Sequence, residues 1–273
     1  MLGLRDALEQ SQKDGVAIGH FNVADWVLLK AVLASGQELN VPVVVGASEG
    51  EREFVGVRQI AAVVRSLREE CNCPIFLNAD HTHSLAKAVE AARAGFDSIV
   101  FDLSALPFEQ NVRQTKEAVE ALKTINSAIL VEGEIGDIGT GSEIHEKAPD
   151  LSGSLTSPAE ARQFVESTAV DILAPAVGNM HGMLKSMVQG QTRKRLDIQR
   201  IAQIKNAAQV PLTLMADRVP TTKICGRQSS LGSISYTSTL NCGLHGGMAW
   251  RRAWLNSQTK SPHIRSCPSQ WNR

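Results

Sequence analysis

Apolar and polar positions along residues 1–214 form blocks that predict strands and helices in alternation. Short, nearly continuous apolar runs such as "VPVVVGAS" are typical of strands that are buried on both faces. The longer blocks between them repeat apolar residues every three to four positions, and "SPAEARQFVEST" opens with the Ser and Pro of a helix start. The predicted strands are 15–23, 41–48, 74–80, 98–102, 128–136, 170–178 and 210–216, and the predicted helices are 26–39, 57–70, 85–95, 108–125, 157–168 and 197–208.

Seven β/α steps with short connections predict a parallel sheet, and their number favours a (β/α)8 TIM barrel. A doubly wound sheet would carry a Gly-rich phosphate loop after its first strand, where this chain reads "GHFNVADW". The barrel is therefore the better prediction. In such a barrel, functional residues lie at the C-terminal ends of the strands.

The regular pattern stops after Leu214. Residues 215–273 contain eight Lys and Arg and one acidic residue, whereas residues 1–214 contain 20 basic and 27 acidic residues. The later segment also holds three of the five Cys, three of the four Trp and the only Tyr. We therefore expect two regions: a β/α barrel of seven strands in 1–214, and a disordered or poorly packed tail in 215–273 without an eighth helix.

Overall composition narrows the function classes. The formal net charge is +0, so nothing points to nucleic acid or to an anionic membrane as a partner. The first residues carry charges throughout, and no stretch approaches the length of a membrane span. Five Cys without a secretory signal indicate a reducing compartment, so we expect a cytoplasmic protein.

Polar side chains gather where the predicted strands end. Two His and several carboxylates from different strands would meet at one rim, and this combination is typical of a metal-assisted site for zinc, or less well for Mn or Co. Taken singly, each has a structural alternative: Asp80 can cap the next helix, His83 can face solvent, and either Glu132 or Glu134 can be structural. The Gly-rich loop 136–145 can cover the site as a lid. The residues at the strand ends are Asn22, Ser48, Asp80, His81, Asp102, Glu132, Glu134 and His181.

Several of these stretches resemble the class II, metal-dependent ketose-bisphosphate aldolases. They are "GHFNVAD", "VPVVVGASEGER", "NADHTHS", "AGFDSIVFDLSALPFEQNVRQTKEAVE", "VEGEIGDIG" and "LAPAVGNMHG", in order up to Leu214. The resemblance implies a TIM barrel that reversibly cleaves fructose or tagatose 1,6-bisphosphate into dihydroxyacetone phosphate and glyceraldehyde 3-phosphate, a step of carbohydrate metabolism. It further implies one catalytic Zn²⁺, room for a second divalent or monovalent cation, and a homodimer or homotetramer.

The resemblance also implies roles for individual residues. Asp80 resembles the acid/base that handles the proton of the substrate C4 hydroxyl. Glu143 resembles the lid glutamate that exchanges a proton at C1 of dihydroxyacetone phosphate, although its loop is one residue off the family spacing. The implied zinc ligands are His81 and His181, with Asp102 and Glu134 as alternative or secondary metal ligands, and the implied contacts to the ketose phosphate are Asn22, Ser48 and Gly182. A Schiff-base mechanism is disfavoured because "DILAPAVG" offers no Lys.

The resemblance fails at the end of the seventh strand, where the family's third zinc histidine opens an "HGGSG" motif. Here "PLTL" continues into "MADRVPTTKICGRQ". Restoring one C before the codon of Met215 permits the reading "HGGSGTDDEDLRQAIVAGINIVHINTELR", which contains the missing histidine, the "GGSG" phosphate nest and an eighth strand, "INIVHI". We therefore expect that one base was lost after the codon of Leu214, and that the tail is an out-of-frame translation.

This frame break predicts a barrel that cannot close, a metal site with two of three histidines, weak zinc affinity and little or no aldolase activity. The alternative is a non-catalytic barrel remnant whose basic tail binds an acidic partner. About one tightly held zinc ion per chain would favour the enzyme over the remnant.

Overall fold

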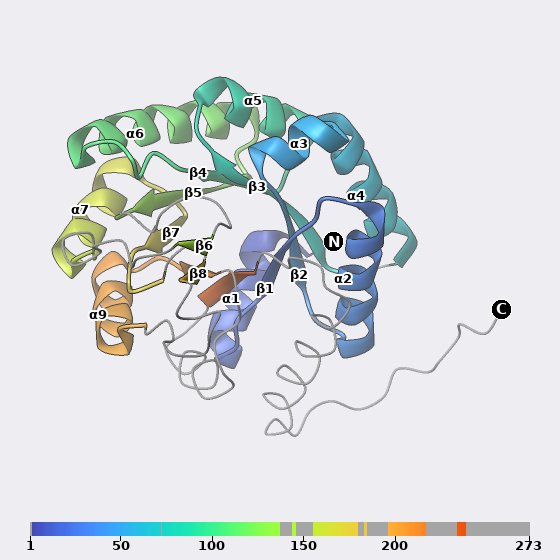
Figure 1. Cartoon of the computed structure of the whole chain (residues 1–273), viewed down its shortest axis with the longest axis horizontal. Coiled ribbons are helices and arrows are strands. Elements are labelled where there is room, and N and C mark those ends of the chain that lie inside the picture. Colours follow the sequence, from blue (N-terminus) through green and yellow to red (C-terminus); the bar gives the residue numbers. More distant parts are fainter. Residues whose placement is uncertain are drawn as a thin grey trace.

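A computed structural model describes residues 2–71, 73–136, 155–179 and 196–216, and the backbone of short strands at 144–145, 183–184 and 234–238. Eight parallel strands form a closed barrel in the order β1-β10-β9-β7-β5-β4-β3-β2, with helices around the outside (Figure 1). The strands are β1 (Gly19–Asn22), β2 (Val43–Ala47), β3 (Ile75–Thr82), β4 (Ser98–Phe101), β5 (Leu130–Ile135), β7 (Ile172–Pro175), β9 (Leu212–Ala216) and β10 (Ile234–Ser238). The predicted β/α barrel fold is confirmed.

The six predicted helices all form, each within one residue of the predicted ends, because their apolar faces pack on the strands. Two further helices, α1 and α3, were not predicted. The helices are α1 (Leu4–Asp14), α2 (Trp26–Leu39), α3 (Glu49–Val55), α4 (Val57–Cys71), α5 (Leu85–Ala94), α6 (Phe108–Ile125), α7 (Pro158–Thr168) and α9 (Ile198–Ala208). Within the described residues none of them contains a segment long and apolar enough to cross a membrane.

Helix α1 closes the N-terminal end of the barrel. Its buried Leu4, Ala7 and Leu8 form a separate apolar cluster with residues at the beginnings of the strands. The strand residues of this cluster are Ile18, Val44, Phe76, Leu130 and Ile172. Because this end is filled with apolar side chains, the opposite, C-terminal end is the one left to carry polar groups.

Two partly buried ion pairs also hold the beginnings of the strands. Asp97, which precedes β4, accepts a hydrogen bond from the backbone N–H of Leu77 at 2.7 Å and pairs with Arg68 of α4 at 2.6 Å. Asp171, which precedes β7, bonds a backbone N–H of β5 at 2.8 Å and pairs with Lys123 of α6 at 2.7 Å. Each anchor therefore ties one helix and two strands together, and these contacts set the register from which the C-terminal rim is built.

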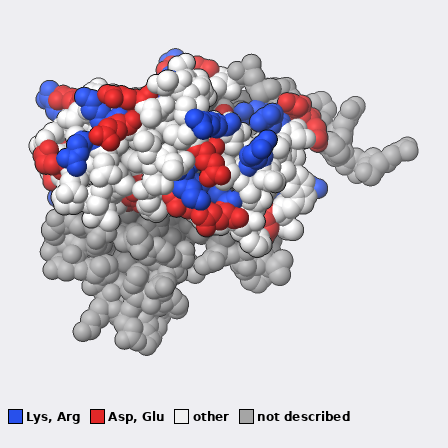
Figure 2. Space-filling view, turned by 90° about the horizontal axis from the view of Figure 1, so that it is seen from above, with Lys and Arg blue, Asp and Glu red and all other residues white. Residues whose placement is uncertain are grey.

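The tail contributes the eighth strand. β10 pairs in parallel with β1 and with β9, so the expectation that the ring of strands stays open is wrong. In the described part of the chain no helix follows β9 or β10. Most of residues 217–273 lie outside the described residues, so the expected lack of an eighth helix stays a prediction. In Figure 2, basic and acidic side chains are interspersed over the described surface on the side shown.

Two loops beyond the rim lie side by side. Short strands β6 (Ile144–His145) and β8 (Met183–Leu184) pair in parallel, which joins the loop after β5 to the loop after β7. The predicted site residues Glu143, His181 and Gly182 belong to these two loops, and they lie outside the described residues.

Candidate metal centre

The end of β3 departs from regular strand geometry where it carries Asp80 and His81. Pairing with β4 shifts register between Ala79 and Thr82, and His81 has a φ of 37°. A left-handed φ is uncommon for a residue with a side chain, and such positions concentrate at functional sites. Neighbouring residues of a regular strand point to opposite faces, so the irregularity explains how both side chains reach the same rim.

His81 meets two carboxylates from the neighbouring strand ends. Its Nδ1 lies 2.9 Å from Oδ2 of Asp102, which follows β4, and 3.7 Å from Oε2 of Glu134 on β5. One ligand atom from each of the three residues lies within 4.8 Å of the others. The structure thus brings together three of the predicted metal ligands.

The charges of this cluster are strongly coupled. Burial opposes a charge on His81, but the nearby carboxylates of Asp80, Asp102 and Glu134 raise its pKa to about 10. Burial likewise opposes ionisation of Asp102, yet its hydrogen bond with His81 holds the pKa of Asp102 well below its usual range. Burial and the Asp102 carboxylate raise the pKa of Glu134 well above its usual range. The cluster therefore retains protons that a divalent cation would displace.

Asp80 lies deeper, against β1. Its side chain is buried, and its Oδ2 accepts a hydrogen bond from Nδ2 of Asn22 at 2.7 Å. Gly46 on β2 permits this contact, because a Cβ there would lie 2.3 Å from Oδ1 of Asn22 and 2.2 Å from Nε2 of His20. The predicted acid/base and one predicted phosphate contact are thus joined directly.

Ser48 is placed at the end of β2 but is engaged in local structure. It is the N-cap of α3, its hydroxyl donates to Oε2 of Glu51 at 2.9 Å, and the Glu51 carboxylate also accepts from the Ser48 N–H at 2.7 Å. This reciprocal pair is a capping box. A role in phosphate binding would require the Ser48 hydroxyl to exchange that partner.

Three more polar residues lie beside the site: Glu132, which belongs to the predicted set at the strand ends, and His20 and His83, to which no functional role was assigned. Glu132 on β5 is buried, and burial helped by the Asp80 carboxylate raises its pKa to about 8. His20 on β1 is buried too, and burial lowers its pKa. His83 is 53% exposed, but its ring stacks beside that of His81 with 6.4 Å between centroids, and its Nδ1 lies 3.0 Å from the Asp102 carbonyl oxygen. A polar residue inside an apolar strand, as in "GHFNV", is the signal that could have found His20.

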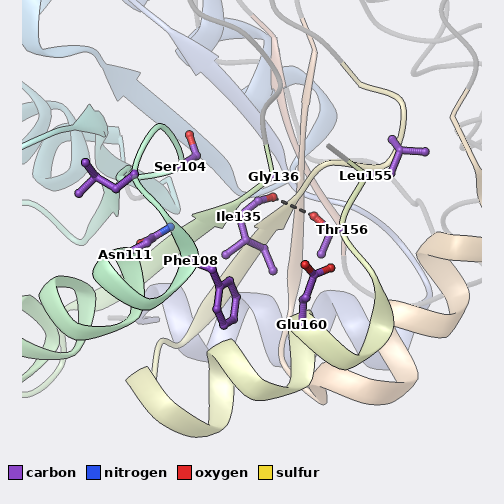
Figure 3. Close-up of a pocket in the computed structure, with 9 residues that line it drawn as sticks. Ser104, Phe108, Asn111, Ile135, Gly136, Leu155, Thr156 and Glu160 are labelled. Atoms are coloured by element: carbon purple, nitrogen blue, oxygen red, sulfur yellow. Dashed lines mark hydrogen bonds between the residues drawn. The ribbon is translucent and has the colours of Figure 1, made fainter. Parts of the chain in front are cut away.

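A cavity of about 190 Å³ lies behind the rim, between α6, α7 and the end of β5 (Figure 3). Its polar side chains support β5: Oγ1 of Thr156 donates to the carbonyl of Ile135 at 2.8 Å, and Nδ2 of Asn111 donates to the carbonyl of Glu134 at 2.9 Å. These contacts hold the strand end that carries Glu134, so the cavity belongs to the scaffold of the centre.

The residues present fit a divalent metal ion. Oε2 of Glu134 is buried and has no hydrogen-bond partner within the described chain. An imidazole nitrogen together with carboxylate oxygens is a donor set that zinc accepts, as do Mn and Co. A cation among these atoms would satisfy the unpaired oxygen and balance the acidic charge.

Relatives of the chain are found both in sequence and in structure. The fructose-bisphosphate aldolase of Thermus caldophilus is 34% identical over 209 residues, which cover 77% of this chain and 66% of that protein. This chain thus spans slightly less than two thirds of that relative. The fructose-bisphosphate aldolase of Geobacillus stearothermophilus is 30% identical over 271 residues, covering 97% of this chain and 88% of that protein. The crystal structure of the YdjI aldolase from Escherichia coli K12 matches with a TM-score of 0.74 at 25% identity, over 95% of this chain and 96% of that one.

A sequence profile described as Fructose-bisphosphate aldolase class-II matches residues 3–221, which is most of the chain. This match agrees with the barrel topology and with a potential metal centre at the C-terminal rim. The chain therefore belongs to the class-II fructose-bisphosphate aldolase family.

Proposed function

We propose that this site carries out metal-dependent, reversible aldol cleavage of a ketose 1,6-bisphosphate, in the cytoplasm, giving dihydroxyacetone phosphate and glyceraldehyde 3-phosphate. The main support is the cluster of His81, Asp102 and Glu134 beside the buried Asp80. Zinc would be held by His81 and His181, with Asp102 or Glu134 as alternative ligands. When bound, it supplies Lewis-acid stabilisation of negative charge on substrate oxygens.

Asp80 is assigned the proton transfer. In cleavage, the C3–C4 bond breaks, its electron pair stays on C3, and the proton of the C4 hydroxyl moves to the Asp80 carboxylate. Condensation reverses these movements. The hydrogen bond from Asn22 fixes the orientation of the carboxylate, and burial keeps water away from it. Glu143 is assigned the exchange of the proton at C1 of dihydroxyacetone phosphate. Ser48 and Gly182 are assigned contacts to a phosphate group of the ketose.

The substrate is either the fructose or the tagatose bisphosphate. These sugars differ only in configuration at C4, the carbon whose hydroxyl Asp80 would deprotonate. The orientation that Asn22 gives to Asp80 therefore acts at the carbon that distinguishes them. Comparing turnover of both sugars by the same protein decides between them.

We further propose that residues 215–273 are translated out of frame. In the restored reading, "INIVHI" falls at positions 233–238, and β10 occupies the eighth barrel position at Ile234–Ser238. The restored histidine falls at position 215. Met215 clusters with Val100, Ala174 and Ala176, and Ala174 pairs with Glu134 across β5 and β7. A histidine at 215 would therefore enter the same interior layer as the acidic ligands.

Three proteins test these proposals: the present chain, its Met215→His variant and a chain with the frame repaired. Met215→His should bind zinc about tenfold more tightly than the present chain. Leu214→His is the control, because adjacent strand residues face opposite sides and Leu214 belongs to the outer core. The repaired chain should bind about one zinc ion and cleave a ketose bisphosphate until a chelator is added.

The possible failures are distinct. A repaired chain that neither binds zinc nor cleaves either sugar would refute the aldolase proposal. Equal turnover by the present and repaired chains would refute the frame proposal, as would an intact reading frame across the Leu214 codon in an active protein.

A further inference from the structure

Arg52 is a buried cation beside the candidate centre. It lies on α3 and is 2% exposed. Its Nη1 donates to the carbonyls of Ala47 and Asp80, the latter at 3.0 Å, and its Nη2 donates to Oγ1 of Thr82 at 2.9 Å. All three acceptors are neutral oxygens. Removing a guanidinium from water is costly, so satisfied hydrogen bonds of this kind are needed to keep it there.

These hydrogen bonds replace a missing strand ladder. The pairing of β2 with β3 ends at Ala47 and Ala79, one residue before Asp80. On the other side, the pairing of β3 with β4 shifts register between Ala79 and Thr82. Arg52 therefore holds the segment from Asp80 to Thr82 where regular pairing with its neighbours lapses.

Helix α3 also contacts the backbone of His83, the residue that follows Thr82. Oε1 of Glu49, three positions before Arg52 and so on the same helix face, accepts the backbone N–H of His83 at 2.7 Å. Contacts from α3 thus lie on both sides of His81, whose φ of 37° needs support from its surroundings.

We propose that Arg52 is a positioning residue for Asp80 and His81: it fixes the irregular backbone from which both side chains reach the rim. This inference rests on the proposed function for its meaning in catalysis, but the geometry it describes exists without metal. Loss of Arg52 frees the carbonyl of Asp80 and the hydroxyl of Thr82, so the backbone at His81 can relax toward a regular strand. The imidazole then turns away from Asp102.

The metal-free test measures solvent exchange of the Nδ1–H of His81 by NMR in the full chain with chelator present. The signal is assigned by its loss in His81→Gln. Arg52→Met should accelerate exchange about tenfold, because the hydrogen bond to Asp102 is no longer held. Arg52→Lys keeps the charge but not the planar fork, so it should fold more readily and still accelerate exchange.

Two control variants separate the loss of positioning from a general loss of charge or of stability. Arg58→Met removes the same charge from an exposed site on α4, and Leu122→Ala weakens the core at α6. Neither should change the exchange of the His81 proton at temperatures well below unfolding. If both Arg52 variants exchange this proton at the rate of the unsubstituted chain, the inference is refuted.

A Co²⁺ titration followed by its visible absorption links the inference to the metal. Arg52→Met should weaken Co²⁺ binding about tenfold relative to the unsubstituted chain, the usual effect of losing a group that orients a ligand. Unchanged affinity would count against the inference. If the unsubstituted chain binds no Co²⁺, the proposed metal function fails, while proton exchange at His81 still decides the role of Arg52.

Discussion

Substitution of Glu132 measures the free-energy cost of a charged carboxylate in the barrel interior. It lies in the middle of β5, pairs with Ile172 of β7, and is 3% exposed. Burial, assisted by the Asp80 carboxylate, raises its pKa from an ordinary 4.5 to about 8. The substitution Glu132→Gln keeps the shape of the side chain and removes its titration.

The expected change in the free energy of unfolding follows from proton linkage. Between pH 4.5 and pH 8 the folded chain binds a proton on Glu132 that the unfolded chain has released, so stability falls as pH rises through this window. Each pH unit costs about 1.4 kcal/mol, which gives a penalty of about 3 kcal/mol at pH 7 and about 1 kcal/mol at pH 5. Because Gln has no proton to lose, the variant should be more stable by up to these amounts.

Thermal unfolding at pH 5 and pH 7, with chelator present, measures the effect. At pH 7 the gain in stability corresponds to a rise in the unfolding temperature of roughly 6–12 °C, and at pH 5 to about a third of that rise. Glu117→Gln, an exposed change on α6, is the matched control. Titrating groups that do not interact with Glu132 act equally in both proteins and cancel in the difference, whereas Asp80, His81 and Glu134 interact with it. A gain that is the same at both pH values, or no gain at pH 7, would refute the reasoning.

Three other predictions concern the anchor at Asp171, the glycine at the rim and the metal centre. Asp171→Ala should lower the free energy of unfolding by about 2–3 kcal/mol, because it leaves the buried N–H of Val131 without an acceptor; chemical denaturation measures it. Gly46→Ala should cost about 1–3 kcal/mol, since its methyl group would lie 2.3 Å from Oδ1 of Asn22 and force it away from Asp80. Metal affinity, measured by competition with a chromophoric chelator, should rise about tenfold per unit between pH 6 and pH 9, because His81 must lose a proton to bind.

Each of these has a control or a contrary result. Asp14→Ala removes an exposed carboxylate at the end of α1 and should change stability little. Gly50→Ala adds a Cβ that meets nothing within 4 Å, so a loss equal to that of Gly46→Ala would contradict the steric argument. A metal affinity that stays constant with pH would mean that no bound proton is displaced.

The fold could be predicted where burial decides structure. Strands such as β2 are apolar along their whole length because both faces are covered, and the main helices show a clear apolar face. The short helices were missed for identifiable reasons. Helix α1 buries only four residues among many charges, and α3 is seven residues long, although its Ser48 and Glu51 form a capping box that the spacing S-x-x-E could have signalled.

The candidate site could be predicted in part, because parallel strands bring their C-terminal ends to one rim. Asp80, His81, Asp102 and Glu134 were inferred in this way, and the structure places them together. Arg52 could not be inferred, since it stands in "EGEREF" among charged residues and looks like part of a solvated surface. Its burial arises from an irregular β3 whose ladder ends early, and strand periodicity cannot reveal such an irregularity.

The place of β10 in the barrel does not agree with its amino-acid composition. β10 closes the ring, yet four of its five residues, Ser235 through Ser238, carry hydroxyl groups. Strands such as β2, β4 and β7 consist of buried, mainly apolar residues, as is typical of a parallel barrel. A strand of this composition has the length and place of a barrel strand without the side chains that fill a core. The restored reading "INIVHI" would place apolar residues at positions 235, 236 and 238 of this strand, and the histidine it places at 215 would enter the layer that contains Glu134. One lost base would account for both defects, the polar strand and the absent ligand, which otherwise need separate causes.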